Sequence, residues 1–163
     1  MNKFIGIGRL TKDLELNQTS SGKVFVECID CRDVREGNRW ILDYLSNADY
    51  KTAIIDGQSG QAVISAEMKA KKIKKFSFPK VKEVIEANAM FERGMYDGSI
   101  VHADQKSVFN VITNTEKRAI GSNGGFGYKS IKSENEIAIL DSIILAYWSC
   151  ATTKEARKQR VFM

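Results

Sequence analysis

The sequence has little proline, histidine and cysteine, and these shortages exclude several classes of protein. One proline and 12 glycines among 163 residues exclude a collagen-like or disordered chain. Three cysteines cannot all pair within one chain and nothing else indicates secretion, so we expect free thiols. Cys28 and Cys31 form a C-x-x-C pair, but further zinc ligands would have to come from Cys150 and His102, which are remote in sequence. A zinc site is therefore disfavoured.

Long hydrophobic runs are also missing. The longest apolar stretch, around residues 137–148, is interrupted by Asp141 and falls short of the ~20 residues that a bilayer span needs. Near the N-terminus, Arg9 and Lys12 follow a short apolar run, so no secretory signal is expected. A cytoplasmic setting is therefore expected. At roughly 100–200 residues per domain, the length predicts a single domain over residues 1–163.

Positive charge is in excess and unevenly placed. Lys and Arg number 25 against 20 Asp and Glu, and residues 69–82 hold lysines but no acid. Clustered lysines release counterions when they meet phosphates, although a solvated face that aids solubility is the alternative. A second basic group flanks the glycine-rich residues 120–128, and a third lies at 154–160. The candidate DNA contacts are Lys71, Lys72, Lys74, Lys75, Lys117, Arg118 and Lys129.

Hydrophobic periodicity predicts an α/β chain. We expect an N-terminal antiparallel hairpin from residues 3–10 and 23–29, and a strand at 52–57 that is buried on both faces. Capping boxes at Asp33/Glu36 and Ser133/Glu136 predict where the first and last helices begin. The remaining expected elements are helices near 61–71, 79–93 and 106–114, a strand at 100–103, and a flexible loop or hairpin tip at 120–128.

Two carboxylates are notable for their positions. Asp56 lies at the carboxyl end of the buried strand, at the sheet edge where ligands usually bind. Asp141 lies on the apolar face of the last helix, between Ile137 and Ile144. A buried carboxylate without a partner is costly, so we expect Asp141 to be paired with Lys or Arg, protonated, or bound to a metal.

A carboxylate pair within a basic surface is typical of a divalent-metal phosphodiesterase. Mg²⁺ prefers hard oxygen ligands and can clamp the attacking and leaving oxygens of a phosphodiester. A two-metal site usually needs a third carboxylate, and the other candidates are Asp13, Asp30 and Asp104. Asp13 and Asp104 are more typical of surface or turn positions, and His102 is either a helper or structural.

Four segments in order carry a resemblance to a known family. They are residues 54–61 (IIDGQSGQ), 81–88 (VKEVIEAN), 117–129 (KRAIGSNGGFGYK) and 141–148 (DSIILAYW). From about residue 29 onward the chain resembles the C-terminal nuclease domain of the large terminase subunit of tailed bacteriophages. The resemblance implies an RNase H-like mixed sheet flanked by helices, and metal-dependent, sequence-tolerant cutting of viral DNA during packaging in a bacterial cell. It implies that Asp56 and Asp141 match two of three acids that hold Mg²⁺ or Mn²⁺, with DNA and phage packaging proteins as partners.

The N-terminal segment departs from this family. Gly8 and Arg9 occupy the neighbourhood of the family's first-strand acid, and residues 1–26 resemble the start of a bacterial single-stranded-DNA-binding protein. The chain is therefore interpreted as a hybrid, whose foreign hairpin can preserve the fold while loss of one acid impairs catalysis. No G-x-x-x-x-G-K-[ST] loop occurs, so no packaging ATPase domain is expected. The leading function is a metal-dependent endonuclease, and the alternative is a non-enzymatic module that binds single-stranded or duplex DNA.

Overall fold

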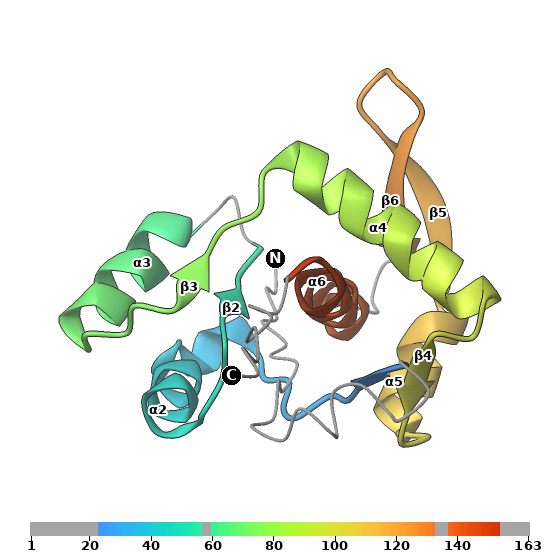
Figure 1. The fold of residues 1–163 in the computed structure, drawn as a ribbon. Helices are drawn as coiled ribbons and strands as arrows, with labels where there is room; N and C mark the ends of the chain where they lie inside the picture. Colours follow the sequence, from blue (N-terminus) through green and yellow to red (C-terminus); the bar gives the residue numbers. More distant parts are fainter. Residues whose placement is uncertain (1–22, 57–59, 133–136, 154–163) are drawn as a thin grey trace, which may run out of the picture.

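The computed structural model describes residues 23–56, 60–132 and 137–153, and these form a mixed α/β chain (Figure 1). The elements, in chain order, are β1 (Val24–Val26), the 3-10 turn η1 (Val34–Glu36), α2 (Arg39–Asn47), β2 (Ala53–Ile54), α3 (Gln61–Ala70), β3 (Phe76–Ser77), α4 (Val81–Tyr96), β4 (Ile100–His102), α5 (Lys106–Thr113), β5 (Thr115–Ile120), β6 (Gly125–Ser130) and α6 (Ala138–Thr152). The predicted α/β class is confirmed. Within these ranges, no helix combines the length and apolar character that crossing a bilayer requires.

The strands pair two by two within the described ranges. β1 runs parallel to β4, β2 runs parallel to β3, and β5 runs antiparallel to β6. Each strand has one described neighbour, so these residues form three small two-stranded sheets. The expected single mixed sheet is not seen among them. The expected first strand at 3–10 lies outside the described residues. Its expected hairpin partner is present as β1, which pairs with β4 in the register Val24↔Ile100.

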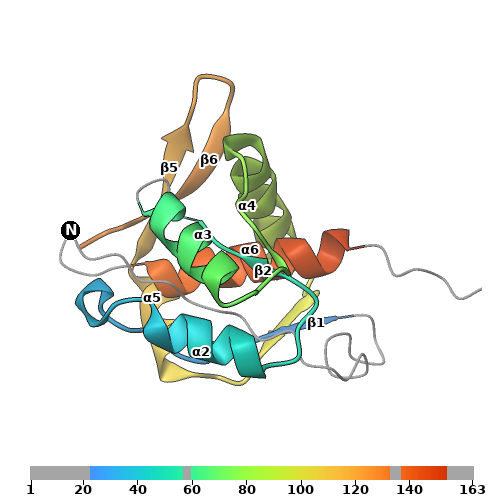
Figure 2. The ribbon, with the colours of Figure 1, turned by 90° about the vertical axis from the view of Figure 1, so that its left-hand side faces the viewer.

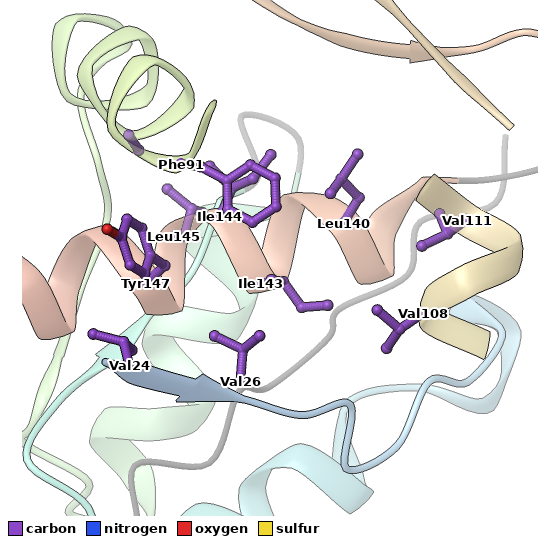
Figure 3. Close-up of a cluster of buried hydrophobic side chains, with 11 residues drawn as sticks. Val24, Val26, Phe91, Val108, Val111, Leu140, Ile143, Ile144, Leu145 and Tyr147 are labelled. Carbon is purple, nitrogen blue, oxygen red and sulfur yellow. The ribbon is translucent and has the colours of Figure 1, made fainter. Parts of the chain in front are cut away.

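Helix α6 lies at the centre of the larger of two hydrophobic clusters, the α6 cluster. Leu140 and Ile144 are almost fully buried, each at 2% exposure. Figure 3 shows the strand β1 on one side of this helix, Phe91 of α4 on another and Val108 of α5 near its start. A helix that is apolar on several faces needs cover from several sides, and α4, α5 and β1 supply it. The first turn of α6, which carries Asp141, is thereby fixed in place.

A glycine closes the contact between α4 and α6. A Cβ atom at Gly94 would lie 2.5 Å from the Tyr147 hydroxyl oxygen, far inside van der Waals contact. The same hydroxyl lies 3.1 Å from Ser99 Oγ, and the Tyr147 ring packs edge to face on Phe91. Gly94 thus allows the two helices to approach closely.

A smaller group, the α2–α3 cluster, contains Ile41, Leu42, Leu45, Ala53, Ile55, Ile64, Met68 and Ile73. Strand β2 joins it to the α6 cluster, because Ala53 and Ile55 face the smaller cluster and Ile54 packs on the larger one. The prediction of a strand buried on both faces is confirmed. Figures 1 and 2 place α2 and α3 on one side of the molecule and show the β5–β6 hairpin projecting from the rest.

The first predicted helix begins later than its capping box suggests. Asp33 accepts hydrogen bonds from the backbone N–H groups of Arg35 and Glu36, but this turn stops as η1. Gly37 then adopts a φ of +74°, in the left-handed region that interrupts a helix, and α2 begins at Arg39. The other predicted capping box, at residues 133–136, lies outside the described residues.

Candidate functional site

Asp56 is placed by the pairing of β2 with β3. The Ala53 N–H donates to the Lys75 carbonyl at 2.9 Å, and the Ile55 N–H donates to the Ser77 carbonyl at 3.0 Å. The pairing ends there, so Asp56 is the first residue beyond it and is exposed. Its predicted place at the carboxyl end of a strand is confirmed.

Asp141 lies in the first turn of α6. The Asp141 N–H donates to the Ile137 carbonyl at 3.1 Å. Asp141 itself is half-buried, next to the buried Leu140. Asp141 was predicted on the apolar face of this helix, and it lies there partly buried, between the buried Leu140 and Ile144.

The structure brings the two acids close enough to interact. The pKa of Asp141 is raised to about 7, chiefly by burial and further by the negative charge of Asp56, while the charge of Arg118 acts in the opposite direction. Burial and a like charge both disfavour the ionised carboxylate. Because water and salt screen charges that are far apart, the effect of Asp56 on Asp141 indicates that the two side chains lie near each other. Asp56 and Asp141, far apart in sequence, therefore form an acidic pair.

Arg118 on β5 is the third charged member of this site. Its Nε donates to the Tyr128 carbonyl at 3.1 Å across the hairpin, and its positive charge acts on Asp141. Sequence analysis assigned Arg118 to DNA binding alone and missed its place beside the acids. The available signal was its position next to the glycine-rich turn, but nothing local reveals that its charge acts on Asp141.

Two of the other candidate acids, Asp30 and Asp104, interact with residues close to them in sequence. Asp104 is 97% exposed, has a φ of +52°, and donates its N–H to Nδ1 of His102, as expected of a turn residue. Asp30 forms an ion pair with Arg32 at 2.7 Å. Asp13 lies outside the described residues. Residues 23–56, 60–132 and 137–153 contain no group of three or more His, Cys, Asp or Glu that could hold a metal.

The donor chemistry of the acidic pair fits Mg²⁺ or Mn²⁺. Carboxylate oxygens are hard ligands, which these ions prefer. Burial is the main cause of the raised pKa of Asp141, and a divalent cation beside Asp56 and Asp141 would offset the smaller contribution from the charge of Asp56. The described residues supply two ligands of such a site.

The three cysteines are thiols, as predicted. Burial is the largest cause that raises the pKa of Cys28, and the charge of Asp30 adds to it. A raised pKa disfavours the thiolate form of this side chain. Cys28 follows β1 and packs against the α6 cluster.

The lysines near α3 divide into two kinds. Lys71 forms an ion pair with Asp43 at 2.7 Å, and Lys75 donates from Nζ to the Tyr50 carbonyl at 3.2 Å. Two others are exposed and have no ion pair or side-chain hydrogen bond with the described residues: Lys72 and Lys74. These two remain available for an anionic ligand.

The glycine-rich stretch forms a closely packed hairpin. Gly121 and Gly124 take φ values of +69° and +76° in the turn, and β6 begins at Gly125. A Cβ at Gly125 would lie 2.7 Å from Cδ1 of Ile85 on α4. The predicted hairpin tip is confirmed at residues 121–124, whereas the glycines of β6 allow close packing.

No protein-family model, curated protein or solved structure matches the chain. What the site can do follows from its own residues: an acidic pair from two elements and one arginine whose charge acts on it. The exposed Lys72 and Lys74 lie in the segment between α3 and β3.

Proposed function

We propose that this chain is a divalent-metal-dependent DNA endonuclease domain with an RNase H-like, terminase-type architecture. The observation that carries the proposal is the interaction of Asp56, at the end of β2, with Asp141, in the first turn of α6. The four segments that resemble the terminase nuclease support it, because they contain both acids and Arg118. DNA is the proposed substrate and phage packaging proteins are the proposed partners.

Asp56 and Asp141 are the residues that would hold Mg²⁺ or Mn²⁺. When bound, the ion supplies Lewis-acid activation of the phosphodiester and of the attacking water. Asp141 ligates only when ionised, and its pKa of about 7 means that the protein must first lose a proton there. We therefore expect activity to rise with pH through neutrality.

Arg118 is the proposed phosphate-binding residue of the site. Its guanidinium lies near enough to influence Asp141, so a DNA phosphate that approached the acids would meet it. Arginine presents several N–H donors in a fixed plane and suits phosphate oxygens. Lys72 and Lys74 offer further contacts with the DNA backbone. Contacts of this kind carry no base information, which agrees with sequence-tolerant cutting.

Nicking of supercoiled plasmid with Mn²⁺ tests this proposal. Asp56→Asn and Asp141→Asn keep the side-chain shape and remove the charge, so each should lower the rate by at least ~100-fold. Asp104→Asn is the matched control, because that acid is exposed in a turn and should leave the rate unchanged. Since the first-strand acid is missing, the assay needs enzyme in excess over DNA and long incubation.

Two results would contradict the assignment. One is nicking that persists in both Asn variants, and the other is nicking that needs no divalent metal. Calorimetric titration with Mn²⁺ is an independent measurement, in which both Asn variants should bind the ion more weakly than the wild type does.

The exposed Lys72 and Lys74 favour a second candidate, a DNA-binding module without catalysis. Phe76 and Phe78 pack edge to face with centroids 5.7 Å apart and lie against the α2–α3 cluster. Rings held in this way offer little surface for stacked bases, so duplex DNA is the favoured ligand. Binding with a steep salt dependence, without nicking by the wild type, would support this candidate.

A further inference from the structure

The β5–β6 hairpin is held against α4 by one ion pair that sequence analysis did not foresee. Lys117 Nζ pairs with Glu92 of α4 and lies 4.5 Å from the centroid of the Phe126 ring. The Glu92 side chain is only 21% exposed. The hydrogen bond to Glu92, together with the charge of Glu92, raises the pKa of Lys117, so the lysine stays charged at neutral pH. Lys117 thus links two elements, the hairpin and α4.

A second ion pair of the hairpin provides a contrast. Lys129 and Glu116 face each other across β5 and β6, and both side chains are more than half exposed. This pair joins two strands that are already paired through their backbones. It adds nothing to the attachment of the hairpin to the rest of the molecule.

Lys117 and Arg118 are neighbours on β5 and project from opposite faces of the strand. Arg118 shares its face with Gly125 and Gly127, and this face of the hairpin packs against α4 at Ile85 and Asn88. The charge of Arg118 acts on Asp141. Close packing of Gly125 on Ile85 holds the same hairpin near its turn.

We propose that Lys117 is a positioning residue and not a DNA contact: its ion pair with Glu92 and its position over Phe126 anchor the hairpin to α4 and so keep Arg118 near Asp141. The consequence for Arg118 rests on the proposed nuclease function, whereas the anchoring itself does not. Among the basic residues predicted to bind DNA, Lys117 is thereby assigned a different role from Lys72 and Lys74.

Hydrogen exchange of the backbone amides at residues 115–130 tests the anchoring directly. We expect Lys117→Met to speed exchange of the hairpin by about tenfold, since Glu92 then loses its partner. Lys117→Arg should restore protection because arginine keeps the charge and the ring contact. The charge-exchanged double variant Lys117→Glu/Glu92→Lys should restore most of it. Lys129→Met is the matched control and should exchange like the wild type.

The salt dependence of DNA binding separates an anchor from a phosphate contact. Removing one phosphate contact lowers the slope of log K against log salt by about 1. Lys74→Met should show this decrease, and Lys117→Met should not. A decreased slope for Lys117→Met together with unchanged hydrogen exchange would overturn the proposal, as would failure of both Lys117→Arg and the double variant to restore protection.

Plasmid nicking reports on Arg118. We expect nicking to fall about tenfold in Lys117→Met and to recover in the double variant, which reverses both charges and keeps the pair. A phosphate contact would not be rescued in this way. If the wild type does not nick DNA, the nuclease proposal fails, while hydrogen exchange and the salt slope still decide whether Lys117 anchors the hairpin.

Discussion

The two hydrophobic clusters are completed at their edges in different ways. The α6 cluster is closed by apolar contact around one helix and by the close approach of Gly94 to Tyr147. The α2–α3 cluster is smaller and is bordered by polar contacts, such as the hydrogen bond from Asn38 Nδ2 to Glu67 at 2.8 Å. Asp141 belongs to the first region, and Asp56 follows the strand that joins both. The acidic pair therefore depends on the two regions keeping their relative position.

The largest expected effect comes from cavities in either cluster. Leu140→Ala in the α6 cluster and Ile64→Ala in the α2–α3 cluster should each lower the free energy of unfolding by about 2–5 kcal/mol. Because β2 packs on both clusters, both variants should still show one cooperative transition in urea, with fluorescence and circular dichroism coinciding. Two separate transitions would mean that the clusters unfold independently.

The close approach of α4 to α6 can be broken at Gly94. Gly94→Ala places a methyl group where the Tyr147 hydroxyl lies, and we expect a loss of about 1–3 kcal/mol in the free energy of unfolding. The same substitution in a Tyr147→Phe background should be less damaging, since the nearest oxygen is gone. Equal losses in both backgrounds would argue against a clash at this contact.

The buried carboxylate predicts a specific pH dependence. The pKa of Asp141 is about 7 in the folded protein and 3.8 in the reference state, so folding disfavours the ionised form. The contribution of Asp141 to stability should therefore be greatest below pH 4, fall as pH rises toward 7, and change little above it. Between pH 5 and 8 we expect Asp141→Asn to remove at least about 1 kcal/mol of that decrease, measured by urea unfolding. Mn²⁺ should stabilise the wild type at pH 8 more than at pH 5.

Sequence patterns predicted what local periodicity determines. Helices α3, α4 and α5, strand β4 and the positions of Asp56 and Asp141 on their elements all follow from apolar spacing and strand ends. Pairing of β1 with β4 was not predictable, because Val24 and Ile100 are far apart in the chain and only the packed structure aligns them. Strand β3 was missed because its two residues lie within the lysine-rich segment.

The glycine-rich hairpin shows a different limit of sequence analysis. The sequence does not distinguish a glycine that permits a turn from one that permits close packing. Only the spatial neighbours of Gly125 show that it belongs to the second kind. The same holds for charge. The sequence predicts both Lys117 and Lys72 to be surface cations, but in the structure Lys117 forms an ion pair with Glu92. Which cations are available to DNA depends on contacts between elements distant in sequence.

The smallest expected effect concerns the polar edge of the α2–α3 cluster. Lys71 and Asp43 form an exposed ion pair, and such pairs contribute little to stability because water screens them and holding the side chains costs entropy. Lys71→Met should therefore leave the urea midpoint almost unchanged, and Lys72→Met should behave in the same way. For DNA binding the two should differ: Lys72→Met loses a phosphate contact, whereas Lys71 is already neutralised by Asp43 and its loss weakens binding less. An equal decrease in salt slope for both would show that DNA displaces Asp43 from Lys71, and that the polar edge of this cluster opens when DNA binds.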